Sequence, residues 1–446
     1  MNLKTKLLKF YSRTKVYLVN TSWIMSEKVL NMGISFLVTP LVARYLGPEK
    51  FGILAYATSY VALFVIAGNV GLNGMVVREL VKYPDADEEI MGTSFALKGA
   101  GYLVGTVLLL IFIFLTEEYQ STEFWLLIIL TVTLLFQPFD VIDFWFQSRL
   151  EAKYTAISKT LALVVSAGLK VTLIFVGANV ILFSLANVIQ AVFGAILLVL
   201  FYRCKSRLSL KNWQVSLTRA KYLLSQGWMV FLGSIFAVIY LKVDQVMLKW
   251  LVGAEDVGIY AVAATLSEAW YFVPAAIVAS FFPKLIKLRD AAPSAYHKRL
   301  QQIFDLLFML ALGVAIAITL IAQPLITIMF GEAYQPAASI LVIHIWAALF
   351  IFMRAAFSKW ILIENVLMFS LITQGMGALA NVALNYWLIP IYGGEGAAYA
   401  TLISYATASY VALVLYSKTR LVFWMMTKSI FSPIRYATAL LLKIKT

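Results

Sequence analysis

A small set of charged side chains interrupts the apolar stretches of this sequence, and these residues are the ones that could do chemistry there. They are Glu27, Lys28, Lys98, Asp140, Asp143, Lys170, Lys242, Asp244, Glu268 and Arg354. A charge at the centre of a membrane helix costs about 2.5–3.5 kcal/mol, so it normally faces a partner or a cavity. Lys28, Lys242 and Arg354 are therefore predicted to line a cavity with positive charge, which suits an anion.

The carboxylates in the same stretches suit cations, protons or gating contacts. The candidates for gating or for binding a coupling ion are Glu27, Asn31, Asp143, Asp244 and Glu268. Other interpretations stay open for some of these charges. Lys98, Asp143 and Arg354 can instead lie near helix ends, where side chains reach the membrane interface. Asp244 can simply pair with a neighbour.

Two of the expected helices carry a stripe of polar residues along one face, as their helical spacing indicates. The stripes are Asn20, Glu27, Asn31 and Ser35 in one helix, and Ser370, Gln374, Asn381 and Asn385 in another. A solid apolar bundle would not need such stripes. They predict a hydrophilic cavity inside a bilayer.

No catalytic or metal-binding pattern accompanies these residues. The chain has one cysteine, Cys204, and two histidines, His297 and His344, too few for a cysteine or histidine metal site. It also lacks a phosphate loop and a nucleophile elbow. Asp140 and Asp143 resemble a carboxylate pair, but beside Pro138 we interpret them as shaping or gating the cavity. We expect no metal, no cofactor and no enzymatic activity.

The elements that must position these residues are membrane helices. Hydrophobic residues make up 62% of the chain, against about 45–50% in soluble domains, and a spanning helix needs roughly 20 mostly apolar residues. We therefore predict an all-α integral membrane protein with about twelve transmembrane helices. Their expected ranges are 17–42, 51–76, 93–115, 124–147, 155–176, 180–202, 222–250, 257–283, 303–322, 336–358, 366–389 and 396–417.

The net charge of +14 is explained by orientation in the membrane. Lysine and arginine gather in alternate connections, namely the N-terminal segment, 203–221, 284–299 and the C-terminal segment. Cytoplasmic loops carry such an excess of cations. The alternation predicts an even number of spans, both termini in the cytoplasm and a multi-pass protein of the cell inner (plasma) membrane. Because the cations lie between apolar runs, we expect no nucleic-acid partner.

The two halves of the chain share a short sequence pattern at a shift of 206 residues. Gly47, Glu49, Gly52, Ile53, Ala55 and Ala57 fall on Gly253, Glu255, Gly258, Ile259, Ala261 and Ala263. Two similar helix-entry turns would also give this match, but we favour duplication, and parallel repeats place a transport site at their interface. The predicted parts are an N-terminal six-helix bundle (1–202), a cytoplasmic linker (203–221), a C-terminal six-helix bundle (222–418) and an amphipathic basic tail (419–446).

Several short segments give the chain a family resemblance. They are Arg44–Gly52 (RYLGPEKFG), 144–147 (FWFQ), Asp244 followed by 257–260 (VGIY), 330–334 (FGEAY) and 394–398 (GEGAA). On these segments the chain resembles the polysaccharide-transporter family of the flippase superfamily that also contains the multidrug MATE exporters, and especially the O-antigen flippases. The resemblance implies a MATE-like V shape of two bundles. It also implies that Lys28, Lys242 or Arg354 meets a diphosphate.

The predicted function is that of a flippase. It would move an undecaprenyl-diphosphate-linked oligosaccharide, an O-antigen or related repeat unit, from the cytoplasmic to the outer leaflet by alternating access during lipopolysaccharide or other polysaccharide biosynthesis. Expected partners are this lipid-linked oligosaccharide, membrane lipid, a coupling ion (H⁺ or Na⁺) and a polysaccharide polymerase. The alternatives are a cation-coupled multidrug exporter, which would prefer an acidic cavity, and a membrane glycan polymerase or ligase, which would need a long external loop. A scaffold protein would not explain the charges.

Overall fold

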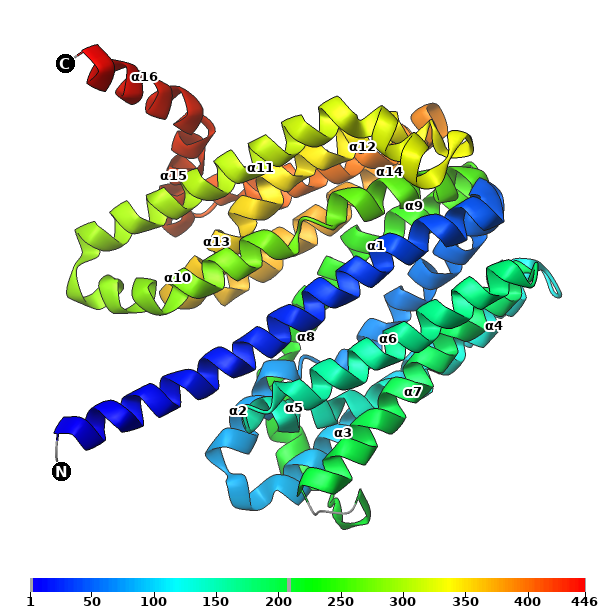
Figure 1. Ribbon diagram of the computed structural model, residues 1–446, viewed down its shortest axis with the longest axis horizontal. Helices are drawn as coiled ribbons and strands as arrows, with labels where there is room; N and C mark the ends of the chain where they lie inside the picture. The colour runs from blue at the N-terminus through cyan, green and yellow to red at the C-terminus, as the bar shows by residue number, and fades with distance from the viewer. Residues whose placement is uncertain (1–2, 207–209, 446) are drawn as a thin grey trace. The chain divides into compact units, whose positions relative to one another are not determined.

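The computed structural model describes the backbone of residues 3–206 and 210–445, and the side chains of 19–206, 210–282 and 284–438. Over this part of the chain the secondary structure is helical, without a strand (Figure 1). The helices of the first half are α1 (Leu3–Asn69), α2 (Asn73–Lys82), α3 (Asp87–Thr116), α4 (Thr122–Thr131), α5 (Val141–Ser148), α6 (Ala152–Phe175) and α7 (Val180–Ser206). Short 3₁₀ turns, among them η3 (Gln137–Asp140), connect some of them.

The second half begins with a long helix and contains the remaining elements. They are α8 (Leu217–Leu251), α9 (Ala254–Glu268), α10 (Phe272–Ala291), α11 (Pro293–Phe330), α12 (Ala337–His344), α13 (Ala348–Glu364), α14 (Leu367–Ser409), α15 (Arg420–Ile430) and α16 (Ser432–Lys445). Helices α15 and α16 fall in the predicted tail. The tail is held to α11 at buried Asp305, which accepts hydrogen bonds from Arg435 (2.6 Å) and Ser429 (2.8 Å).

Ten stretches of the described chain are long and apolar enough to cross a membrane. Two of them, Val19–Lys82 and Leu367–Val414, have 64 and 48 residues, which is room for two crossings each at roughly 20 residues per crossing. Both are broken by a glycine with positive φ, Gly47 (φ 74°) in the first and Gly393 (φ 53°) in the second. These breaks lie where the sequence predicted one spanning helix to end and the next to begin. The prediction of an all-α, multi-pass membrane protein with about twelve spans is confirmed.

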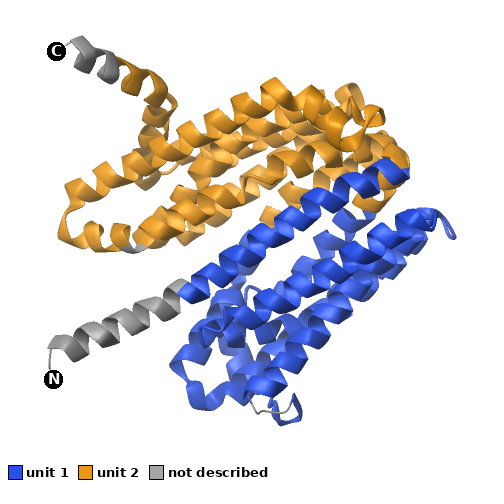
Figure 2. Cartoon of the chain, in the orientation of Figure 1, with its two compact units in different colours: residues 1–46, 57–235 blue, residues 47–56, 236–446 orange. Residues whose placement is uncertain are grey.

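The described chain divides into two compact units (Figure 2). Unit 1 comprises residues 1–46 and 57–235, and unit 2 comprises 47–56 and 236–446. The boundaries expected from the sequence, 1–202, 203–221, 222–418 and 419–446, stay a prediction about the repeats. Residues 207–209 of the linker, and the side chains of 1–18 and of the last residues of the tail, lie outside the described part.

Each unit has its own apolar core. In unit 1, Phe146 and Ile142 of α5 pack with Tyr202 of α7 and with Leu72 and Leu80 at α2. In unit 2, aromatic residues of α11 and α13 form the centre of the core, among them Phe304, Phe352, Phe357 and Trp360. These cores fix the helices that carry the polar residues described below.

Two glycines from the shared sequence pattern meet in unit 2. A methyl group on Gly52 would overlap the carbonyl oxygen of Ala254, and one on Gly258 would overlap the carbonyl oxygen of Pro48. Pro48 and Ala254 are themselves related by the 206-residue shift, so the contact is reciprocal. The glycines that precede each segment, Gly47 and Gly253, have positive φ values of 74° and 119°, which side-chain-bearing residues rarely adopt.

Candidate functional site

Unit 1 holds a group of charged side chains inside its candidate spanning segments. Lys159 of α6 donates a 2.8 Å hydrogen bond to the Asp143 carboxylate of α5 and forms an ion pair with it. Lys98 of α3 is only 2% exposed, and its Nζ lies 4.9 Å from the centre of the Phe144 ring. Asp140, at the end of η3, lines a cavity together with Lys98 and Lys159. Opposite charges thus compensate one another within this cluster.

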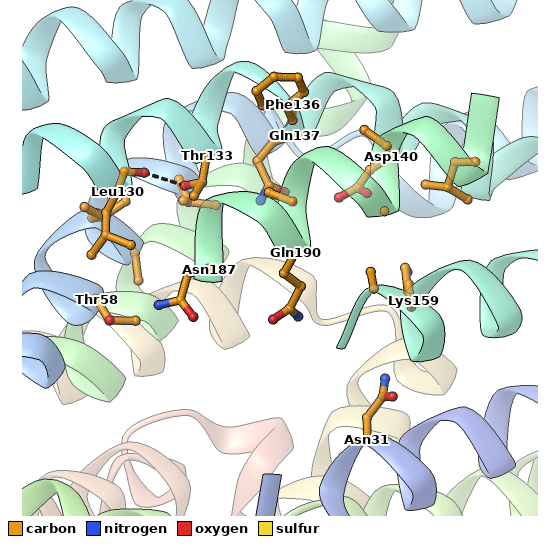
Figure 3. Close-up of a pocket in the computed structure, with 18 residues that line it drawn as sticks. Asn31, Thr58, Leu130, Thr133, Phe136, Gln137, Asp140, Lys159, Asn187 and Gln190 are labelled. Atoms are coloured by element: carbon orange, nitrogen blue, oxygen red, sulfur yellow. Dashed lines mark hydrogen bonds between the residues drawn. The ribbon is translucent and has the colours of Figure 1, made fainter. Parts of the chain in front are cut away.

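Two adjoining cavities lie beside this cluster. The larger has a volume of about 530 Å³ and is lined by polar side chains from α1, α7 and η3, shown in Figure 3, as well as by apolar residues. The smaller, of about 360 Å³, is lined by Lys98, Asp143 and other residues. Both cavities share Val65, Gln137, Asp140 and Lys159 in their walls. Unit 1 therefore contains two adjoining, partly polar cavities among its candidate membrane-spanning segments.

The predicted polar stripe of the first helix faces this space in part. Asn31 lines the larger cavity, and its Nδ2 donates a 3.3 Å hydrogen bond to Glu27 Oε1. Lys28 follows Glu27 directly, so the two side chains point about 100° apart on the helix. The structure leaves Lys28 exposed and Glu27 half-buried.

Unit 2 contains a different kind of polar cluster, centred on Asp244 of α8. The Asp244 carboxylate is 3% exposed. It accepts hydrogen bonds from Tyr260 Oη of α9 (2.8 Å) and, from α14, Thr401 Oγ1 (2.6 Å) and Asn385 Nδ2 (2.6 Å). Asn385 Nδ2 also donates to Asn381 Oδ1 at 3.1 Å. Every one of these donors is neutral, so an ionised Asp244 carries a negative charge that no described cation within ion-pair distance balances.

The oxygen atoms around Asp244 form a set that a small hard cation prefers. Asn385 Oδ1 and Asn381 Nδ2 are buried and have no hydrogen-bond partner among the described residues. A half-turn of the Asn385 amide would bring its carbonyl oxygen to the Asp244 carboxylate, beside Asn381 Oδ1 and the hydroxyl groups of Thr401 and Tyr260. Hard cations bind carboxylate, carbonyl and hydroxyl oxygens of this kind. The charge and the geometry of this cluster therefore fit Na⁺, or a proton on the carboxylate.

The predicted cations of unit 2 have different surroundings. Lys242 Nζ lies 3.9 Å from Glu268 Oε2, a loose ion pair of half-exposed side chains. Arg354 of α13 donates hydrogen bonds to the carbonyl oxygen of Ala408 (2.8 Å) and to Thr373 Oγ1 (3.2 Å). Neither acceptor is charged. Arg354 therefore keeps a positive charge without a carboxylate partner among the described residues.

The structure brings some of the predicted residues together within a unit. In unit 1, Glu27 contacts Asn31, and Asp143 pairs with Lys159. In unit 2, Lys242 lies near Glu268. The predicted stripe residues Asn381 and Asn385 meet Asp244. Lys28 lies in unit 1, whereas Lys242 and Arg354 lie in unit 2, and the shared positive lining of these three residues stays a prediction.

Several functional candidates were missed from the sequence. Among the residues that were not singled out are Lys159, near the start of the expected helix 155–176, and Gln137, Asn187, Gln190, Tyr260 and Thr401. Asn187 and Gln190 carried a usable signal, because polar residues three apart in an apolar helix share a face. Tyr260 and Thr401 carried none, since ordinary tyrosines and threonines abound in such helices.

Sequence comparison finds relatives named as a flippase and as a transporter. One, from Haloferax volcanii and named "Probable flippase AglR", is 25% identical over an alignment of 409 residues that covers 84% of this chain and 78% of that protein. Another, from Shigella flexneri and named "Putative O-antigen transporter", is 24% identical over an alignment of 311 residues that covers 66% of this chain and 72% of that protein.

Solved structures share the fold of the whole chain. The inward closed conformation of the lipid II flippase MurJ matches with a TM-score of 0.69 and 12% identity, covering 94% of this chain and 93% of MurJ. An inward-facing multidrug MATE transporter matches with a TM-score of 0.61 and 16% identity, covering 92% and 99%. Identities this low show a common fold only.

A family model settles which group the sequence belongs to. The model described as "Polysaccharide biosynthesis protein" matches residues 17–289, more than half of the chain. The family expected from the short segments around Arg44–Gly52 and beyond is thereby confirmed. This chain belongs to the polysaccharide biosynthesis protein family.

Proposed function

We propose that this protein is a flippase for a lipid-linked oligosaccharide and not an enzyme. Its substrate would be an undecaprenyl-diphosphate-linked O-antigen or related repeat unit, moved from the cytoplasmic to the outer leaflet of the inner membrane by alternating access. The observation that carries the proposal is the pair of adjoining, partly polar cavities in unit 1, which share Asp140 and Lys159 in their walls, with Lys98 in the wall of the smaller one. The names of the two relatives agree with it.

The physical problem that such a protein solves matches this space. A polar glycan cannot cross about 30 Å of hydrocarbon unaided, because each unpaired polar group costs several kcal/mol there. The prenyl chain of the same lipid can remain in the bilayer. A protein needs only to supply hydrogen-bonding groups at membrane depth, and unit 1 supplies them.

A negative headgroup also needs a cation and a driving force. Arg354 is the best candidate for the cation, because its charge has no described carboxylate partner, and Lys28 and Lys242 remain further candidates. With both termini in the cytoplasm and an inside-negative potential, outward movement of an anion is favoured by about 2.3 kcal/mol per charge per 100 mV.

The Asp244 cluster is the proposed site of the coupling ion. Its single carboxylate is surrounded by neutral oxygen-bearing groups, and two amide atoms there lack partners. We assign Na⁺ to this cluster, because the amide oxygens of Asn381 and Asn385 and the hydroxyl groups of Thr401 and Tyr260 can supply oxygen ligands beside the carboxylate. Na⁺ would travel as a co-transported or counter-transported ion.

The flippase proposal is tested by deleting the gene in its native host. We expect surface polymer to disappear and its lipid-linked precursor to accumulate on the cytoplasmic side of the inner membrane, where externally added glycosidase cannot reach it in spheroplasts. Complementation with the wild-type gene is the control. Normal surface polymer in a strain without a second exporter, or a precursor that is already accessible from outside, would refute the proposal.

A further inference from the structure

The larger cavity of unit 1 has a wall of neutral amide side chains. Asn187 and Gln190 lie one turn apart on α7, and Gln137 comes from η3; Figure 3 shows all three at this cavity, with Asn31 from α1. On the same face of α7 the next residues in the wall are small, among them Ala191 and Gly194. Because these residues have little or no side chain, they leave open volume beside the amide groups of Asn187 and Gln190.

These amides are not occupied by the protein itself. Among the described residues, no hydrogen bond is made by the side chains of Gln137, Asn187 or Gln190, and Asn31 Oδ1 is buried without a partner. Asn31 Oδ1 is a buried polar atom, and such atoms are nearly always paired in native proteins. Gln137, Asn187 and Gln190 are half-buried and line the cavity, so a ligand or water inside it can reach their amide groups. Four amides that converge on one cavity are therefore available to a ligand.

The chemistry of the wall selects the class of ligand. An amide both donates and accepts hydrogen bonds and carries no charge, which matches hydroxyl and acetamido groups. Apolar residues such as Phe136, Leu130 and Val61 also line the cavity and suit the C–H faces of a sugar ring, as in most ligand pockets where a few polar groups fix orientation. A phosphate fits poorly, because Lys159 is already paired with Asp143 and Asp140 adds negative charge.

We propose that this cavity is a glycan chamber, in which Gln137, Asn187 and Gln190 hydrogen-bond the neutral sugars of the lipid-linked substrate and determine which sugars are accepted. The inference rests on the proposed flippase function. It assigns sugar recognition to unit 1 and separates it from the binding of the diphosphate.

The test measures binding of two lipids to the purified full-length protein by native mass spectrometry. One is the lipid-linked oligosaccharide extracted from the host, and the other is undecaprenyl diphosphate without sugar. The variants are Gln190→Met and Asn187→Leu, which keep side-chain size but remove the amide, and the double variant. Gln226→Met, on an exposed residue of unit 1 outside both cavities, is the matched control.

We expect the wild-type protein and the control to prefer the oligosaccharide lipid. Each single variant should weaken its binding about two- to tenfold, the range of one or two lost hydrogen bonds, and the double variant should bind both lipids alike. Affinity for undecaprenyl diphosphate should not change in any variant, which also reports that the variants are folded.

Four results would overturn the glycan chamber. The wild-type protein binding both lipids equally, or the double variant keeping the wild-type preference, would remove sugar recognition from these amides and leave the flippase proposal standing. An equal loss of both lipids in variants that unfold at the wild-type temperature would do the same, since the amides would then not distinguish sugar. A folded wild-type protein that binds neither lipid would refute the flippase proposal itself, and the chamber with it.

Discussion

Replacing Gly258 with alanine should destabilise unit 2, because backbone atoms already occupy the position of the added methyl group. It would overlap the carbonyl oxygen of Pro48 and lie 3.0 Å from the backbone nitrogen of Gly52. Backbone atoms cannot rotate away as a side chain can, so the two helices must move apart. Such overpacking costs about 1–3 kcal/mol, whereas alanine in place of glycine inside a helix normally gains up to about 1 kcal/mol.

Gly33→Ala is the matched control for this prediction. Gly33 also lies inside a helix, and no atom stands within 4 Å of where its methyl group would be, so this variant should keep or slightly raise stability. We therefore expect the free energy of unfolding of Gly258→Ala to be about 1–4 kcal/mol lower than that of Gly33→Ala. Thermal unfolding of the purified proteins in the same detergent shows which of the two variants unfolds at the lower temperature.

The reciprocal variant gives an internal check. Gly52→Ala should be destabilised to a similar degree, since its methyl group would overlap the carbonyl oxygen of Ala254. The double variant should cost less than the two single variants added together, because contacting residues are not independent. If Gly258→Ala and Gly33→Ala unfold at the same temperature, the close crossing of these helices is wrong.

Two further predictions concern the charges of unit 2. Replacing choline in the buffer with Na⁺ at constant ionic strength should raise the unfolding temperature of the wild-type protein but not of Asp244→Asn, because a ligand stabilises the state that binds it. A wild-type protein whose unfolding temperature does not respond to Na⁺ would refute the ion assignment. Arg354→Gln should lose most polymer export at an unchanged protein level, and Arg354→Lys should keep part of it, because binding an anionic headgroup requires the positive charge. Full export by Arg354→Gln would show that Arg354 serves packing through Thr373 and Ala408.

Most of the fold could be predicted from the sequence because lipid imposes a simple rule. Apolar runs of about 20 residues must be helices. The interruptions around Gly47 and Gly393 marked the ends of spans, and the backbone there is kinked and non-helical. The division into two units was less predictable. Residues 47–56 follow the first span but pack with residues after 236, which depends on the contact between Gly52 and Gly258.

The candidate site was predictable only in its charged members. Charges such as Asp143 and Asp244 are conspicuous in apolar helices because their cost demands a purpose. Their partners were not conspicuous. Lys159 lies near the start of the expected helix 155–176 and two turns into α6, which begins at Ala152. A lysine near a helix end can reach the membrane interface, so its pairing with Asp143 was not evident. Thr401 reaches Asp244 across 157 residues of chain, and no local pattern encodes such a contact.

The two polar clusters differ in how their charges are balanced, and this difference suits them to different tasks. Lys159 and Asp143 neutralise each other at 2.8 Å, so unit 1 can stay polar without binding or releasing an ion. Asp244 has only neutral donors, and a buried carboxylate so placed gains most from a cation or a proton. A transporter needs both a lasting polar surface for its substrate and one charge whose partner can leave. The proposed glycan chamber belongs to the first kind and the Asp244 cluster to the second, so mutations at Gln190 should alter substrate preference while mutations at Asp244 should alter ion dependence.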